Sequence, residues 1–298
     1  MQFFKILSYL FILAIFSSFL GSFHPVFDSI SVFRQYLAIP ICLSFIISCY
    51  FKEHLLTFFS FIIITISFFS TFSLFHSNHL PKNTEHSHYS LYQKNLSFRL
   101  KSYNALIADI HKTNPDFITL QEVTKRHKRI LKRLKTSHPY QHHCDFGTVG
   151  GIAILSKIPL KKDSYACLNG SARAKLQDKN IWLTSIHLHW PWPFKQEQQI
   201  EEIVNGLTKL NSKLNTKHII AGDFNTVKWS SNIREMNKRL NIKSVNETNY
   251  SFFLENILPI AIDQVLLPKN TQSISATRPL LGSDHKGIYA EFLIGNPL

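Results

Sequence analysis

Residues 218–225, "HIIAGDFN", join an apolar run to an acid and an amide that stand two positions apart. The apolar run predicts a buried strand, and Asp223 and Asn225 follow at its end. A turn is one interpretation, because Gly, Asp and Asn are common turn formers after a strand. A metal or phosphate site is the other. The rest of the chain decides between them.

Short apolar runs recur through the later part of the chain, and helical patterns separate several of them. The strand-like runs are residues 89–95, 116–123, 150–156, 180–189, 218–225, 261–267 and 287–294. The helix-like segments are residues 100–114, 125–135 and 195–214. Strands interleaved with helices in this way indicate a layered α/β fold.

Six strand or loop ends supply an oxygen or imidazole group. They carry Asn95, Glu122, His187 with His189, Asp223 with Asn225, Asp263, and Asp284 with His285. Each residue alone has a structural explanation, as a turn former or a hydrogen-bonded histidine. Six such ends in one chain indicate a shared site, because ligand sites in layered α/β folds gather at strand ends. The set is rich in hard oxygen ligands and poor in thiols, which favours Mg²⁺ or Mn²⁺ over structural zinc.

Four motifs follow one another along the chain: LQEV (120–123), IHLH (186–189), GDFN (222–225) and GSDH (282–285). In this order they resemble the endonuclease/exonuclease/phosphatase superfamily, from about Tyr89 to Leu293. The resemblance implies a four-layered α/β sandwich of the deoxyribonuclease type, with two packed mixed sheets flanked by helices. "HLHWPWP" and "GDFNTVKWS" look like the membrane-anchored bacterial branch that includes the teicoplanin-resistance membrane protein.

The resemblance also implies a reaction, the hydrolysis of a phosphoester or pyrophosphate bond by metal-assisted attack of water, without a covalent enzyme intermediate. Glu122 is expected to hold the divalent metal, with Asn95 and Asp284 close to it. His285 is expected to take the proton from the attacking water. Asp263 would orient that imidazole and keep it basic.

The remaining roles concern the water and the phosphate. Asp223 is expected to align the water, and Asn225 to donate to a phosphoryl oxygen. His187 would donate to the developing phosphorane. Arg173 is a candidate phosphate clamp, with a surface arginine as the alternative. His189 is interpreted as a neighbour of the site.

The resemblance implies an active-site asparagine at the end of the first strand, and the chain offers two candidates for it, Asn95 and Asn104. We favour Asn95, because residues 100–114 then form the helix that separates it from Glu122.

The first 75 residues contain three apolar stretches, 6–23, 36–51 and 55–75. The third has no charge and can span a hydrocarbon core of about 30 Å. Three transmembrane helices are therefore expected, with a cleaved signal peptide followed by a two-span hairpin as the alternative. The expected organisation is a membrane anchor at 1–75, a polar linker at 76–88 and the catalytic domain at 89–298.

Charge and cysteine positions bear on location. Lys5 and Lys52 on one side and Arg34 on the other give a weak positive-inside bias, which places the catalytic domain outside. The expected location is the bacterial inner membrane, with an extracytoplasmic domain. There, Cys144 and Cys167 could pair.

The part after residue 75 is strongly basic. It carries +13 of the formal +14, because Lys5, Arg34 and Lys52 against Asp28 and Glu53 leave +1 before it. Part of this excess lies in residues 125–135, which fit an amphipathic helix with a solvated basic face.

Three functions remain open at this stage. The first is a membrane-anchored phosphohydrolase acting on a phosphorylated lipid or another phosphoester, with the bilayer as its partner and no protein partner implied. Trp190 and Trp192 could then lie at the interface, although a rigid loop without membrane contact explains them too. The second is a nuclease, because a basic domain also suits nucleic acid. The third is a non-catalytic binding module, against which the intact set of acids, amides and imidazoles argues.

Overall fold

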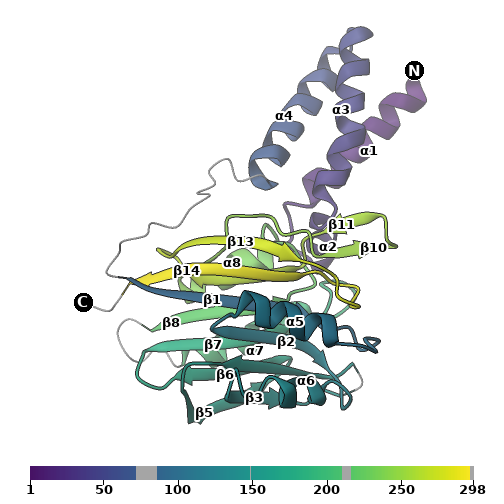
Figure 1. Ribbon diagram of the computed structural model, residues 1–298. Coiled ribbons are helices and arrows are strands. Elements are labelled where there is room, and N and C mark those ends of the chain that lie inside the picture. Colours follow the sequence, from purple (N-terminus) through teal and green to yellow (C-terminus); the bar gives the residue numbers. More distant parts are fainter. Residues whose placement is uncertain (72–85, 148, 210–215, 296–298) are drawn as a thin grey trace.

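The computed structural model describes residues 1–71, 86–147, 149–209 and 216–295, and Figure 1 shows N-terminal helices standing on a layered α/β domain. The N-terminal helices are α1 (Gln2–Ser17), α2 (Pro25–Ser31), α3 (Arg34–Tyr50) and α4 (His54–Thr71). The linker expected at residues 76–88 falls mainly outside the described residues. Its last three residues belong to the first strand, which begins at His86.

The α/β domain contains two six-stranded sheets and a separate hairpin. The first sheet has the order β13 (Gln272–Arg278), β14 (Gly287–Gly295), β1 (His86–Asn95), β2 (Phe117–Val123), β4 (Gly151–Ser156) and β3 (Tyr140–Cys144). The second has the order β5 (Leu160–Leu168), β6 (Ser171–Leu176), β7 (Ile181–His187), β8 (Lys217–Asp223), β12 (Asp263–Pro268) and β9 (Ile242–Ser244). The hairpin pairs β10 (Phe252–Leu254) with β11 (Leu258–Ile260).

Each sheet contains one parallel pair, β1 with β2 and β7 with β8, and its other pairs are antiparallel. The carboxyl ends of two parallel neighbours lie at the same edge of a sheet. In the second sheet this register puts His187 opposite Asp223, and Asp223 opposite Asp263 on β12. Strand pairing therefore begins to assemble the predicted site.

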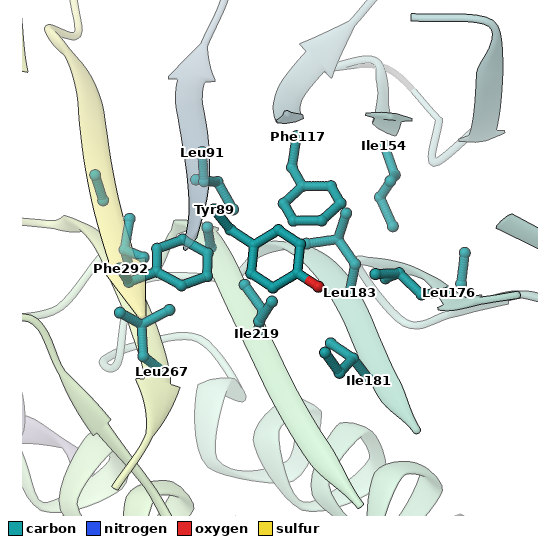
Figure 2. Close-up of a cluster of buried hydrophobic side chains, with 14 of the residues drawn as sticks. Tyr89, Leu91, Phe117, Ile154, Leu176, Ile181, Leu183, Ile219, Leu267 and Phe292 are labelled. Atoms are coloured by element: carbon teal, nitrogen blue, oxygen red, sulfur yellow. The ribbon is translucent and has the colours of Figure 1, made fainter. Parts of the chain in front are cut away.

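The main core lies between the two sheets, and Figure 2 shows part of it. Tyr89, Phe117 and Phe292 of the first sheet face Leu183 and Ile219 of the second, and all are buried. The aromatic rings of Tyr89 and Phe117 have centroids 5.6 Å apart. Alternate residues along each strand point into this layer, as the period of two in a strand requires.

Helices cover the outer faces of both sheets and complete the four layers. Helices α5 (Asn104–Thr113) and α6 (Lys128–Arg133) pack on the first sheet. Helices α7 (Gln196–Thr208) and α8 (Ser231–Leu240) pack on the second. The predicted sandwich of two mixed sheets between helices is confirmed. The amphipathic helix expected within residues 125–135 is also confirmed, because Ile130 and Leu134 are fully buried.

Some elements were not predicted from the sequence, notably β5, β6, β13 and helix α8. Strand β5 is an edge strand in which Lys161, Lys162 and Asp163 are exposed. Charged edge strands resist pairing with other chains, but they lack the apolar alternation that reveals a buried strand. Helix α8 has only three buried side chains, Ile233, Met236 and Leu240, so its apolar stripe is narrow.

The N-terminal helices form a small bundle. Helices α1, α3 and α4 meet around the buried side chains of Ile15, Ile41 and Ile63. By length and composition, one described helix, α4, can cross a membrane; α2 and α3, bent by 68° at their junction, pass as one further candidate, and α1 is a shorter apolar helix. The apolar stretch at residues 6–23 does not form one continuous helix, because α1 ends at Ser17 and the next helix, α2, begins at Pro25.

Candidate active site

The predicted polar residues gather at the end of the sandwich where β1, β2, β7 and β8 terminate. Asn95 ends β1, His187 ends β7 and Asp223 ends β8. Glu122 is the penultimate residue of β2. Asp263 begins β12, and His285 lies in the loop that leads to β14. Side chains from both sheets thus meet at one edge.

The innermost group consists of His285 and two buried carboxylates. His285 Nδ1 lies 2.7 Å from Asp263 Oδ2, and His285 Nε2 lies 3.8 Å from Asp223 Oδ2. Because Asp263 fixes Nδ1, the other ring nitrogen is directed toward Asp223. This arrangement matches the expected pair of an imidazole and its orienting carboxylate.

Electrostatics differ among these three groups. Burial lowers the pKa of His285, but the charges of Asp263 and Asp223 outweigh it and raise that pKa to about 10. Burial raises the pKa of Asp263, yet His285 and several hydrogen bonds hold it below its usual value. Burial also raises the pKa of Asp223, and the neighbouring Asp263 adds to that rise. Of the two carboxylates, Asp223 is therefore the one whose negative charge is less stabilised by its neighbours.

Asn95 connects the two sheets at this site. Its Nδ2 donates to Glu122 Oε1 at 3.1 Å and to Asp223 Oδ2 at 2.9 Å. Its Oδ1 accepts from the backbone N–H of Ser97. Asn95 is fully buried, and its amide holds the two carboxylates at a fixed separation. Asn104, the alternative candidate, instead begins α5 and accepts from Arg133 Nη1.

Glu122 owes its direction to a break in the strand. The pairing of β2 with β4 shifts register between Leu120 and Val123, and Glu122 has a φ of 56°. Such a conformation costs about 1–3 kcal/mol in a residue other than glycine, and it is often found at functional sites. Gly150 permits it, because a Cβ there would lie 2.8 Å from the Glu122 carbonyl carbon. The Phe98 N–H donates to Glu122 Oε2 at 2.6 Å.

His187 and Asn225 complete the group. His187 Nε2 lies 3.7 Å from Asp223 Oδ2 and 4.0 Å from Glu122 Oε1. Asn225 has a φ of 48°, and its N–H donates to Asp223 Oδ1. Its Nδ2 donates to the carbonyl of Leu188 at 2.8 Å. The turn after β8 therefore supports Asp223 as well as supplying a polar side chain, so the turn interpretation of "GDFN" is compatible with a site at the same residues.

Three supporting residues were missed from the sequence. Gln93 Nε2 donates to Asp263 Oδ1 at 2.7 Å, and Ser251 Oγ accepts from the Asp263 N–H at 3.1 Å. Lys94 is fully buried, and its Nζ donates to the carbonyls of Leu280 at 2.8 Å and His285 at 2.5 Å. Gln93 could have been found, because it lies two positions before Asn95 and therefore on the same face of the strand.

Two predicted residues are placed differently. Asp284 is exposed, and Ser283 Oγ lies 3.5 Å from its Oδ1, so its expected role at the metal stays a prediction. The structure does not bring Arg173 to the site. Its Nη1 donates at 2.8 Å to the carbonyl of Gly206 in α7, on the outer side of the second sheet. The expected phosphate clamp therefore has no support from its position.

The donor set suits a divalent metal. Within the described residues, Asp223, Asp263 and His285 have ligand atoms within 4.8 Å of one another, but the imidazole is already bonded to Asp263. Glu122 and Asp223 offer carboxylate oxygens that face one another across the Asn95 amide. Hard oxygens of this kind suit Mg²⁺ or Mn²⁺. Glu122 is the residue we expect to hold the ion.

A cavity of about 270 Å³ adjoins His187. Phe146, Val149, Leu188, His189 and Gln199 are among the residues that line it. His189 therefore neighbours the site, as interpreted from the sequence, and its N–H is held by Gln199 Oε1 at 2.8 Å. The cavity gives a substrate room beside the catalytic groups.

The chain belongs to the endonuclease/exonuclease/phosphatase family, whose model matches residues 92–285. It is thus a metal-dependent phosphoester hydrolase, and the resemblance seen in the sequence motifs is confirmed at that level. A comparison with curated protein sequences found no match.

Solved structures share the fold at low identity. TDP2 from Caenorhabditis elegans is 16% identical with a TM-score of 0.54, covering 69% of this chain and 98% of its own. Beta toxin from Staphylococcus aureus, in a mutant with bound magnesium ions, is 17% identical with a TM-score of 0.53, covering 68% and 99%. ANGEL2, a 2',3'-cyclic phosphatase, is 14% identical with a TM-score of 0.56, covering 71% and 97%.

Proposed function

We propose that the protein is a membrane-anchored, Mg²⁺- or Mn²⁺-dependent phosphohydrolase that cleaves a phosphoester or pyrophosphate bond of a lipid-linked phosphate. The observation that carries this proposal is the attachment of the catalytic group to an apolar helical bundle in one chain. The family supplies the chemistry, and the bundle supplies the reason to expect a lipid.

The bundle has the surface expected of a membrane anchor. Phe3, Leu13, Leu43, Phe61 and Phe69 are among its many large apolar side chains that face outward, each more than half exposed. Helices of 16 to 18 residues are ~24–27 Å long, close to the ~30 Å hydrocarbon core. We infer three membrane helices, α1, α3 and α4, because each pair of them is in contact.

The cysteines support an extracytoplasmic position for the catalytic domain. Cys144 on β3 and Cys167 on β5 form a disulfide that joins the edges of the two sheets. Disulfides persist in oxidising compartments, so the bond favours an extracytoplasmic catalytic domain, in agreement with the charge bias. For a bacterial protein this would be the outer face of the inner membrane.

The residues divide the work of water attack. His285 accepts the proton from the attacking water at Nε2, while Asp263 holds Nδ1 and stabilises the imidazolium that forms. Asp223 lies within 3.8 Å of that nitrogen and aligns the water. His187 and Asn225 donate to phosphoryl oxygens as negative charge develops. A divalent ion held by Glu122 would neutralise phosphate charge and, as a nearby cation, lower the pKa of His285 toward neutrality.

The test uses the full chain in lipid nanodiscs with Mg²⁺. Four substrates are compared: a water-soluble chromogenic phosphodiester, a phospholipid, a polyprenyl pyrophosphate and plasmid DNA. We expect release of phosphate or headgroup from a lipid substrate, abolished by chelation and by Glu122→Gln or His285→Ala. The matched control is Glu235→Gln, an exposed side chain on α8.

Each outcome decides between functions. Cleavage of plasmid DNA alone, lost in both active-site variants, would replace the lipid proposal with the nuclease that the basic charge favours. Equal rates for Glu122→Gln and the wild type would remove the catalytic assignment. Lack of turnover with every substrate would favour the binding module.

A further inference from the structure

The large apolar side chains exposed on the α/β domain share one location. Among the described residues from 86 onward, those more than about two-fifths exposed are Phe98, Val149, Trp192, Phe194, Ile257 and Leu280. Each lies in a loop or hairpin at the end of the sandwich where Asn95, Glu122 and His187 meet. We call this set the apolar rim. Surface apolar side chains are ordinarily scattered, so their restriction to one end indicates a binding surface.

Cationic side chains accompany the rim. Lys125 and Arg126 are exposed in the loop that follows Glu122. The Arg99 guanidinium lies 5.2 Å from the centre of the Phe98 ring, and Lys286 Nζ lies 4.9 Å from that of Phe253. Basic and aromatic residues together are typical of surfaces that meet anionic headgroups, where the rings enter the interface and the cations meet phosphate.

The membrane anchor docks at this same end of the domain. The fully buried carboxylate of Asp28 in α2 accepts from the backbone N–H groups of Ser231, at 2.8 Å, and Asn232, at 3.0 Å, at the start of α8. Trp229 Nε1 donates to the carbonyl of Ser31 at 2.8 Å. The backbone N–H of Trp192 donates to Ser29 Oγ at 3.0 Å. One member of the rim is thus hydrogen-bonded to the anchor.

The anchor also contacts the hairpin that carries Ile257. The Tyr36 hydroxyl at the start of α3 donates to the carbonyl of Pro259 in β11. Figure 1 shows α2 beside the β10–β11 hairpin, with the bundle rising above them. Phe252 of β10 packs on the catalytic His285, with ring centroids 4.8 Å apart. The helices therefore leave the domain close to both the rim and the active site.

We propose that the apolar rim contacts the bilayer in which the anchor is embedded, and that the active site takes anionic phosphate groups from lipids of that same leaflet. The bilayer is the occupant of this surface because the helices that enter it are continuous with the contacts at Ser29 and Pro259. The substrate part rests on the proposed function, whereas the contact itself does not.

The contact is tested by quenching tryptophan fluorescence with lipids brominated in their acyl chains, in nanodiscs of the full chain. Of the four tryptophans, Trp182 and Trp229 are buried, Trp190 is partly buried and packs against the cluster around Trp229, and Trp192 is half exposed. Trp192→Phe should therefore remove a large part of the quenching, and Trp190 contributes the same background to every variant. In that background, a tryptophan is placed at Ile257 in the rim or at Asn270. Asn270 is exposed in the turn between β12 and β13, at the opposite end of the sandwich.

We expect Ile257→Trp to restore quenching and Asn270→Trp to leave it unchanged. Equal quenching at the two positions, or no change on Trp192→Phe, would overturn the contact. The comparison does not depend on activity, and both added tryptophans replace exposed side chains, so neither is expected to prevent folding.

The substrate part is tested with Phe194→Ser and Ile257→Ser. We expect a roughly threefold to tenfold rise in the KM for lipid substrate in a bilayer, because an interfacial apolar contact is lost, with unchanged turnover of the soluble diester. Equal effects on both substrates would show that the variants damage the site itself. A correct quenching pattern without any lipid turnover would leave the bilayer contact standing and reject the proposed function.

Discussion

His285 Nδ1 lies 2.7 Å from Asp263 Oδ2, although the two residues are in different segments and only Asp263 belongs to a strand. The contact depends on the start of β12 and the loop before β14 being held together. Ser251 binds the backbone of Asp263, and the Lys286 N–H donates to the carbonyl of Ser251. Ser251, just before the hairpin, therefore holds both residues of the His285–Asp263 pair.

Asp263→Asn should lower kcat by about 10²- to 10⁴-fold, because the amide can no longer stabilise the imidazolium form of His285. The KM should change little. Steady-state kinetics with the soluble diester measure the effect, with the exposed Asp163→Asn as the control. A loss confined to KM would contradict the proposed role.

Glu122→Gln should weaken metal binding. Mg²⁺ that binds only the folded state stabilises it, by ~2.7 kcal/mol when the free Mg²⁺ concentration is a hundred times Kd. This stabilisation raises the melting temperature. We expect this metal-dependent rise in the wild type and in Glu235→Gln, and its loss in Glu122→Gln. A full thermal shift in Glu122→Gln would place the ion on other ligands.

Lys94→Met should destabilise the fold by about 2–3 kcal/mol, because the carbonyls of Leu280 and His285 lose a buried charged donor. The loop that carries His285 should loosen too, so kcat for the soluble diester should fall. Chemical denaturation and kinetics measure the two effects, and the exposed Lys112→Met is the control. Normal stability would show that the ammonium is dispensable.

The buried His218 predicts a pH dependence of stability. Burial, followed by the charge of Arg173, lowers its pKa to about 4 in the folded state, against 6.5 for an ordinary histidine. The unfolded chain therefore binds the proton more readily. Stability should be undiminished above pH 6.5 and fall by about 3 kcal/mol as the pH drops to about 4.

This pH effect is isolated by comparing His218→Gln with the exposed His111→Gln in thermal unfolding at several pH values. The difference in unfolding free energy between wild type and His218→Gln should narrow as the pH falls from 6.5. A constant difference would show that His218 does not titrate in this range.

Asp28→Ala should cost about 1 kcal/mol, the typical value of a lost helix cap, because Ser230 Oγ still caps α8 through the Ile233 N–H. Hydrogen exchange at the start of α8 should accelerate, since Asp28 no longer holds the Ser231 and Asn232 N–H groups. Asp178→Ala, at an exposed position, is the control. Unaltered exchange would mean that the anchor does not brace α8.

Particular residues show how far sequence reasoning reaches. Asn95, Glu122, His187, Asp223, Asp263 and His285 could be chosen because polar groups at strand ends stand out against apolar runs. Arg173 could not be placed, because a single arginine on a short strand carries no sign of which sheet face it occupies. Lys94 and Ser251 were missed, because their partners are backbone carbonyls and N–H groups far along the chain.

By itself, the sequence determined the alternation of strands and helices, the family motifs and the separation of an apolar N-terminal part from a basic domain. These are local patterns, and their period and order are readable in one dimension. Tertiary structure alone decided that Asn95 joins Glu122 to Asp223, that Asp28 caps α8, and that the exposed apolar side chains share the active-site end. Those relations depend on sheet register and on loops closing over long separations, where no short-range pattern records the partner.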